Sequence, residues 1–145
     1  MGARVPLRAG PSLNRDEIRR RVAGARVAAL ATLDGDGRPH LVPITFVLSG
    51  DEVFTAVDHK PKTTRALKRL ANIRRDPRVT VLVDSYDEDW TKLWWCRLRG
   101  TARIIDEVIE LFGVKYEQYR GRLPSGPVIA VAIDEWTGWS SKGEG

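Results

Sequence analysis

The residues with the clearest capacity for chemistry are cations and hydroxyls between residues 59 and 79. This stretch, HKPKTTRALKRLANIRRDPRV, holds eight Lys or Arg and one acid. Lys60, Lys62, Thr63 and Arg65 stand at the start of an expected helix. A helix start favours anions, because its first N–H groups are unpaired and its dipole is positive there. Cations crowded at that point predict a bound phosphate, which would satisfy the N–H groups, the hydroxyls and the cations together.

Two other interpretations of this basic segment stay open. A run of charge is most often a solvated surface. Nucleic acid binding is favoured by the net charge of +5, but no base-reading motif accompanies the charge, which argues against nucleic acid as a partner.

The sequence lacks the motifs of nucleotide-binding loops, metal sites and acid–base catalysis. No GxGxxG or Walker loop occurs, and the Gly-rich piece DGDG is typical of a hairpin turn. Cys96, His40 and His59 have no metal-ligand spacing, so we expect no metal site. No catalytic side chain can be named from a motif. A redox cofactor fits this lack of acid–base machinery, because the cofactor carries the hydride chemistry itself.

A second group of residues combines aromatic rings with cations. In the expected strand LWWCRLRGTARII, the period of two places Trp95, Arg97 and Arg99 on one face. Trp136 and Trp139 bracket a glycine near the C-terminus. Tryptophan is more often core than ligand contact, yet rings beside cations suit a planar anionic ligand.

The elements that must position these residues are short strands with few helices. The expected strands are residues 27–33, 39–48, 52–57, 78–84, 93–105 and 128–136. The expected helices are residues 14–23, opened by an Asn14–Glu17 capping signature, the basic segment ending before Pro77, and residues 106–120. Six strands with short connections predict a mainly β, α+β fold: a six-stranded antiparallel barrel with flanking helices.

The length of 145 residues fits one domain. We expect a flexible arm over residues 1–11 and a single barrel domain over residues 12–145. No apolar run approaches a membrane span and no signal peptide opens the chain, so we expect a cytoplasmic protein without membrane contact.

Three motifs together resemble the pyridoxamine 5′-phosphate oxidase-like split β-barrel superfamily. They are ALATLDGDGRPHLVPITF, HKPKTTRALKRLANIRRDPRVTVLVD and LRGTARI, and the likeness covers about residues 20 to 136. The chain is most similar to the branch assigned to coenzyme F-420, a deazaflavin with a phosphate and an oligoglutamate tail. The order K-T-x-R-x-L…R-D-P-R-V is the most specific part of the resemblance.

The resemblance implies an FMN-binding split barrel, a homodimer with cofactor sites at its interface, and hydride transfer between F-420 and a small organic substrate. It implies that the phosphate is held by Lys60, Lys62, Thr63 and Arg65, and the ring by Pro43, Ile44, Thr45, Thr55, Ala56 and Val57. Candidates for aromatic contacts from the facing subunit are Trp95, Trp136 and Trp139. Arg97 and Arg99 could meet the tail of carboxylates.

Two alternatives to an F-420 enzyme remain. One is an FMN-dependent oxidase or reductase on the same barrel, and the other is a cofactor- or nucleic-acid-binding module without turnover. Pyridoxamine phosphate oxidases carry an Arg and His pair near the C-terminus, whereas this chain has no His after His59. That departure argues against the vitamin B6 reaction.

Overall fold

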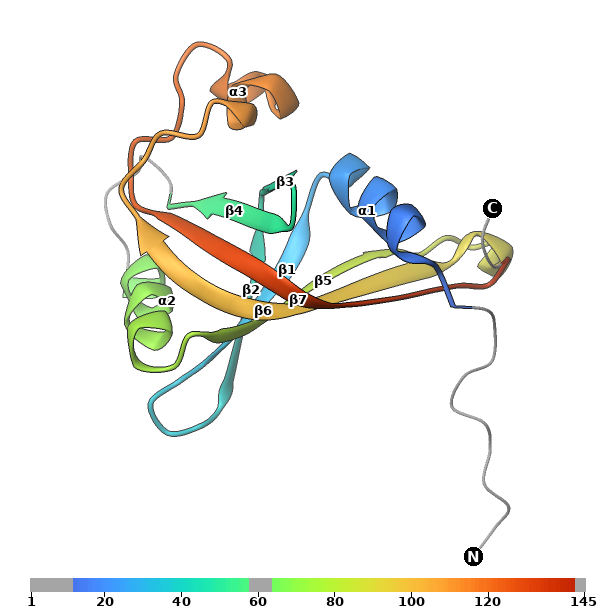
Figure 1. Ribbon diagram of the computed structural model, residues 1–145, viewed down its shortest axis with the longest axis horizontal. Coiled ribbons are helices and arrows are strands. Elements are labelled where there is room, and N and C mark those ends of the chain that lie inside the picture. The colour runs from blue at the N-terminus through green and yellow to red at the C-terminus, as the bar shows by residue number, and fades with distance from the viewer. Residues whose placement is uncertain (1–11, 58–63, 143–145) are drawn as a thin grey trace, which may run out of the picture.

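The computed structural model describes residues 12–57 and 64–142, with only the backbone for residues 64–67 (Figure 1). The predicted arm, residues 1–11, and the predicted phosphate ligands Lys60, Lys62 and Thr63 lie outside the described residues. None of the described helices is long and apolar enough to cross a membrane.

The described residues form seven strands and a few short helices. The strands are β1 Ala28–Leu33, β2 Pro39–Ile44, β3 Val47–Ser49, β4 Glu52–Ala56, β5 Arg78–Ser85, β6 Trp94–Ile105 and β7 Val128–Ser140. The α-helices are α1 Arg15–Gly24, α2 Thr64–Arg75 and α3 Leu111–Lys115, and two 3₁₀ turns are η1 Trp90–Lys92 and η2 Glu117–Tyr119. The predicted mainly β class with flanking helices is confirmed.

All strand pairs are antiparallel, in one curled sheet of order β2-β1-β5-β6-β7-β4-β3. The edge strands β2 and β3 follow one another in the chain, separated only by Thr45 and Phe46. The two edges of the sheet therefore meet at these two residues, which close the half-barrel through the chain itself. We call this junction the seam.

The sequence predicts one strand over residues 39–48, but the structure breaks it at the seam. The reason is that side chains, not a neighbouring strand, satisfy the backbone of Phe46. Its N–H donates to the Tyr116 hydroxyl at 3.1 Å, and its carbonyl accepts from Lys115 Nζ at 2.9 Å. This break is the origin of the seventh strand.

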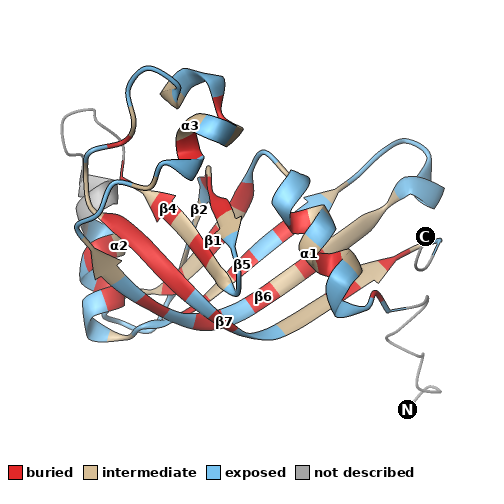
Figure 2. Cartoon of the chain, turned by 45° about the horizontal axis from the view of Figure 1, so that its top comes forward, coloured by how far each residue is buried: buried red, intermediate tan, exposed pale blue. Residues whose placement is uncertain are grey.

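Two helices pack against the core of the half-barrel. Ile18 and Val22 of α1 and Leu70 and Ile73 of α2 are buried in the same core as the inward residues of the strands. The predicted cap of α1 is confirmed, because the Asn14 side chain accepts from the Glu17 N–H at 2.8 Å. In Figure 2 the buried residues alternate with less buried ones along β6, as expected for a strand with one face on the core.

The predicted helix over residues 106–120 is wrong in extent. Only α3 is α-helical, and Tyr116 leaves it with extended backbone angles of φ −116° and ψ 121°. Phe112 and Tyr116 pack with Val47 of β3 in a small cluster separate from the barrel core. Contacts to the seam therefore override the helical spacing of this segment.

Candidate functional site

The residues predicted to contact a cofactor ring gather around the seam. Thr45 lies in it, and the Thr55 hydroxyl of β4 donates to the Thr45 carbonyl at 2.8 Å. Ile44, Thr55 and Val57 are buried, so their side chains pack within the fold. Ala56 packs against the small cluster that contains Phe112 and Tyr116.

The remaining predicted ring residue, Pro43, lies on the outer face of the sheet. It pairs with Ala29, which pairs with Leu82, which pairs with Arg97. Pro43 and Arg97 therefore share one row across four strands, although 54 positions separate them in the sequence. The tertiary structure links two residues that the sequence assigns to different parts of the ligand.

Helix α2 follows the described part of β4 after a short gap and has no acid in its first turn. Arg65 lies in this turn, and its side chain is not described. One helical turn further on, the Arg69 Nε is buried without a hydrogen-bond partner among the described residues. Burial lowers the pKa of this guanidinium. A guanidinium whose Nε is buried without a partner among the described residues, one turn from an acid-free helix start, fits an anionic group such as a phosphate.

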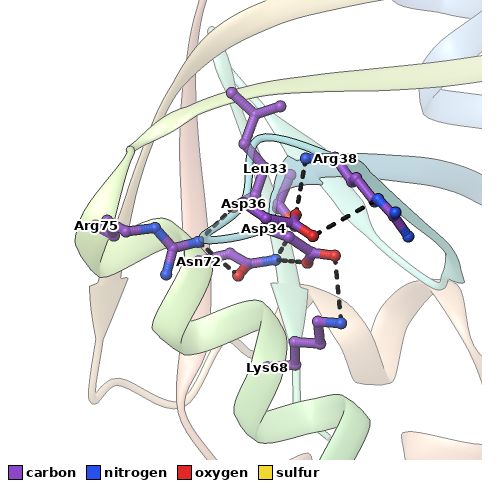
Figure 3. A network of polar contacts seen from close by, with 8 residues as sticks. Leu33, Asp34, Asp36, Arg38, Lys68, Asn72 and Arg75 are labelled. Atoms are coloured by element: carbon purple, nitrogen blue, oxygen red, sulfur yellow. Dashed lines mark hydrogen bonds and ion pairs between the residues drawn. The ribbon is translucent and has the colours of Figure 1, made fainter.

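The second half of α2 is attached to the β1–β2 hairpin by a polar network (Figure 3). Asn72 is buried and donates to the Thr32 hydroxyl at 3.0 Å and to the Asp34 carboxylate at 2.9 Å. Arg75 donates to the Leu33 carbonyl at 2.7 Å, and Lys68 Nζ lies 3.3 Å from Asp34. These cations have partners within the chain, so their role is structural.

The same holds for the end of the R-D-P-R-V motif. Arg78 donates to both carboxylate oxygens of Asp76, at 3.0 and 2.7 Å. These bonds lower the pKa of Asp76 to about 2. The most specific part of the motif therefore connects α2 to β5 in addition to any role at a ligand.

The outer face of β6 and β7 brings the predicted aromatic and cationic residues together. Trp95 pairs with Trp139, Arg97 with Thr137, and Arg99 with Glu135. The Arg97 guanidinium lies 5.5 Å from the centre of the Trp95 ring, and its Nε is buried without a partner among the described residues. Arg99 lies 3.6 Å from Glu135, so its charge is compensated within the chain.

Trp136 lies apart from the other two candidate tryptophans. The register between β6 and β7 shifts at Arg99 and Gly100, and this bulge reverses the side of the sheet on which the following β7 residues lie. Trp136 therefore packs against the core beneath α1, with the Arg19 guanidinium 4.7 Å from its ring centre. The three-residue spacing already places Trp136 and Trp139 on opposite faces by the period of two, whereas the bulge before Trp136 is not visible in the sequence.

Cys96 and the metal-binding residue types are two further candidates for chemistry among the described residues. Burial raises the pKa of the Cys96 thiol to about 11, which disfavours a thiolate nucleophile. Among residues 12–57 and 64–142, no group of three His, Cys, Asp or Glu could hold a metal ion.

The sequence interpretation missed a cavity between the seam and α3. Thr45 forms part of its lining, together with residues of α3, η2 and the segment that follows. The signal was present in the stretch KYEQYRGR, residues 115–122, where three cations and two tyrosines fall within eight residues. Its assignment to an amphipathic helix concealed it.

The chain was compared with protein-family models and with solved structures. The family model for pyridoxamine 5′-phosphate oxidase matches residues 15–140. Similar solved structures include a conserved hypothetical protein from Mycobacterium tuberculosis, with 22% identity, a TM-score of 0.72 and coverage of 95% of this chain and 91% of that one.

Two further similar structures carry cofactor names. A FAD-binding protein from Mesorhizobium loti has 20% identity and a TM-score of 0.66, and the match covers 88% of this chain and 94% of that one. An F-420 reductase has 20% identity and a TM-score of 0.60, with coverage of 81% and 94%. Identities this low establish the shared fold alone.

Proposed function

Because the chain belongs to the pyridoxamine 5′-phosphate oxidase family, we propose that it is an oxidoreductase that binds coenzyme F-420. The bound deazaflavin would supply hydride transfer to or from a small organic substrate. The protein would bind the phosphate, hold the ring at the seam and exclude water from the reacting partners. No protein nucleophile is required.

The single observation that carries the proposal is the cationic start of α2, the helix that comes after β4 in the chain. The helix has no acid in its first turn, and Arg69 is left with a buried, unpartnered Nε among the described residues. Lys60 and Lys62 precede the helix in the sequence. A phosphate at this point would be held by the segment that follows β4, the strand that carries Thr55.

The choice of F-420 over FMN rests on cations beyond those that one phosphate needs. Arg97 is the best candidate for a carboxylate of the oligoglutamate tail, because its Nε has no partner among the described residues. Arg99 is a weaker candidate, because it already pairs with Glu135.

We also propose that the protein is a homodimer that shares its sites across the outer face of the sheet. Val27, Leu41 and Leu82 expose 58%, 66% and 38% of their surface on that face, around a shallow cavity of about 290 Å³. A second copy would cover this apolar area and bring its tryptophans toward the ring. Light scattering at saturating cofactor should give a dimer mass, and a monomer mass contradicts a shared site.

A titration tests the cofactor assignment. The purified protein is mixed separately with F-420, FMN, FAD and a duplex oligonucleotide, and each binding is followed by fluorescence. Saturation by F-420 at micromolar protein supports the proposal. Preference for FMN or FAD would make the protein a flavin enzyme, and saturation by the duplex alone would make it a nucleic-acid-binding module.

A variant pair localises the phosphate. Lys62→Ala should weaken F-420 binding by about 1.5 to 3 kcal/mol, the range of a charge-assisted hydrogen bond. Arg74→Ala is the matched control, because Arg74 is exposed on the last turn of the same helix. Unchanged affinity in both Lys62→Ala and Arg65→Ala would exclude the helix start as the phosphate site.

A further inference from the structure

The cavity between the seam and α3 carries an excess of positive charge. Its volume is about 980 Å³, and its cations are Arg26, Lys115, Arg120 and Arg122. Glu117 is the one acid among the described residues that line it. Within the described ranges, no ion pair involves any of the four cations. The cavity therefore offers charge that the described part of the chain leaves uncompensated.

Lys115 occupies the inner wall of this cavity. Its Nζ lies 2.9 Å from the Phe46 carbonyl and 3.8 Å from the centre of the Phe46 ring. An ammonium has three N–H donors, and the Phe46 carbonyl uses one, so donors remain for a ligand. Burial first, and then the charge of Arg26, lower the pKa of Lys115 to about 8. An anion beside it would relieve both effects.

Arg26 is held next to Lys115 by contacts that do not need a ligand. Its guanidinium donates to the Lys115 carbonyl and lies 5.7 Å from the centre of the Tyr116 ring. The Tyr116 hydroxyl lies 2.8 Å from the Arg26 carbonyl and 3.0 Å from the Phe46 carbonyl, and its single proton can be donated to either. Two cations are therefore fixed close together before any ligand binds, which reduces the entropic cost of binding.

Two tyrosines of the lining offer aromatic surface to a planar body. Tyr116 and Tyr119 meet edge to face, with ring centres 6.1 Å apart, and both line the cavity. Pockets for small ligands combine such aromatic walls with a few polar groups, in volumes of about 300 to 1,000 Å³.

We propose that this cavity binds a small organic carboxylate with a planar, conjugated body, and that Lys115 and Arg26 hold its carboxylate. Thr45 is both a lining residue and a predicted contact of the cofactor ring. The ligand is therefore assigned as the substrate of the hydride transfer. This last assignment rests on the proposed function, whereas carboxylate binding does not.

Calorimetry on the full chain without cofactor tests carboxylate binding directly. The probes are cinnamate and its neutral isostere cinnamamide, which share a conjugated planar body and differ in charge. We expect cinnamate to bind at least about tenfold more tightly, as expected for one charge-assisted contact. Equal affinities, or no cinnamate binding, would overturn the proposal.

Three variants assign the contact to Lys115. Lys115→Gln should lose at least about tenfold in cinnamate affinity, and Lys115→Arg should restore most of it because the charge returns. Arg74→Gln removes the same charge from an exposed position outside the cavity and should change affinity less than about twofold, since distant exposed charges are screened. A thermal melt of each variant verifies folding. If folded Lys115→Gln binds cinnamate as the wild type does, Lys115 is not a ligand.

The pH dependence gives a second readout. Cinnamate affinity should be constant between pH 6 and 7 and should fall as pH rises through about 8, where Lys115 loses its proton. The other ionisable groups that line the cavity are Arg26, Glu117, Tyr116, Tyr119, Arg120 and Arg122. In Lys115→Arg the decline should disappear, because arginine stays charged over this range. A decline that persists in Lys115→Arg contradicts the assignment.

The failure of this inference can be told from failure of the proposed function. If the protein binds cinnamate but not F-420, the cofactor assignment is wrong and the carboxylate site stands. If it binds F-420 but not cinnamate, the carboxylate site is wrong and the cofactor assignment stands. If both bind, Lys115→Gln should raise KM for a conjugated carboxylate substrate and leave F-420 affinity within about twofold, because the residue contacts substrate alone.

Discussion

Two cation-rich regions of this protein differ in whether their positive charges have partners within the described part of the chain. Where α2 meets the β1–β2 hairpin, Lys68 and Arg75 have an acid or a carbonyl as partner within the chain. In the cavity beside α3, Arg120 and Arg122 have no ion pair within the described residues, and Lys115 has a carbonyl but no acid. Charge alone therefore does not mark a binding site. The availability of that charge to a ligand depends on which partners the fold supplies.

The largest expected loss of stability is at the contact between α2 and the β1–β2 hairpin. Asn72 is 2% exposed, and its side-chain amide hydrogen-bonds with Thr32, Asp34 and Arg75. Asn72→Ala removes this amide and leaves the three groups without that partner. We expect a loss of about 3 kcal/mol in the free energy of unfolding. Urea denaturation measures this value. Arg74→Ala is the control and should stay within about 0.5 kcal/mol of the wild type.

The next effect is at the wall of the cavity. Tyr116→Phe keeps the ring but removes the acceptor for the Phe46 N–H, which is buried at the seam. An unpaired buried N–H costs about 1 to 3 kcal/mol. Thermal and urea unfolding should show this loss, whereas Tyr86→Phe, at a side chain that is 71% exposed, should show none. Equal stability of the two variants would mean that another group satisfies Phe46.

A smaller effect concerns the protonation of Lys115. Its pKa falls from an ordinary 10.5 to about 8 on folding. Between these values the folded state holds fewer protons than the unfolded state, so stability should rise with pH above about 8. The stability of wild type relative to Lys115→Gln should therefore increase from pH 7 to pH 9.5. A constant difference would show that Lys115 is not desolvated.

The smallest effect concerns Asp76, whose pKa is lowered to about 2 by hydrogen bonds from Arg78. A lowered carboxyl pKa stabilises the fold above the unfolded value of about 4, and the contribution is lost as pH falls through about 2. Wild type and Asp76→Asn should therefore differ most above pH 4 and converge near pH 2. A difference that is independent of pH would place the effect of the substitution outside this ion pair.

Much of the fold could be predicted from local pattern. Turns at DGDG and SGD need glycines with positive φ, and Gly37 and Gly50 have φ values of 86° and 59°. The helical spacing of Leu70 and Ile73 predicted the buried side of α2, and both are buried. These features depend on near neighbours in sequence, which is why the sequence reveals them.

The sequence by itself determined the fold class, the capping of α1, the inward and outward faces of β6, and the charge that precedes α2. Only the tertiary structure decided where strand 39–48 breaks, which side of the sheet Trp136 takes, and which cations keep a free charge. Each of these depends on a partner far along the chain: Tyr116 lies 70 positions from Phe46, and Asn72 lies 38 from Asp34. A local pattern cannot specify such partners, because hydrogen bonds and ion pairs form between groups that folding brings together.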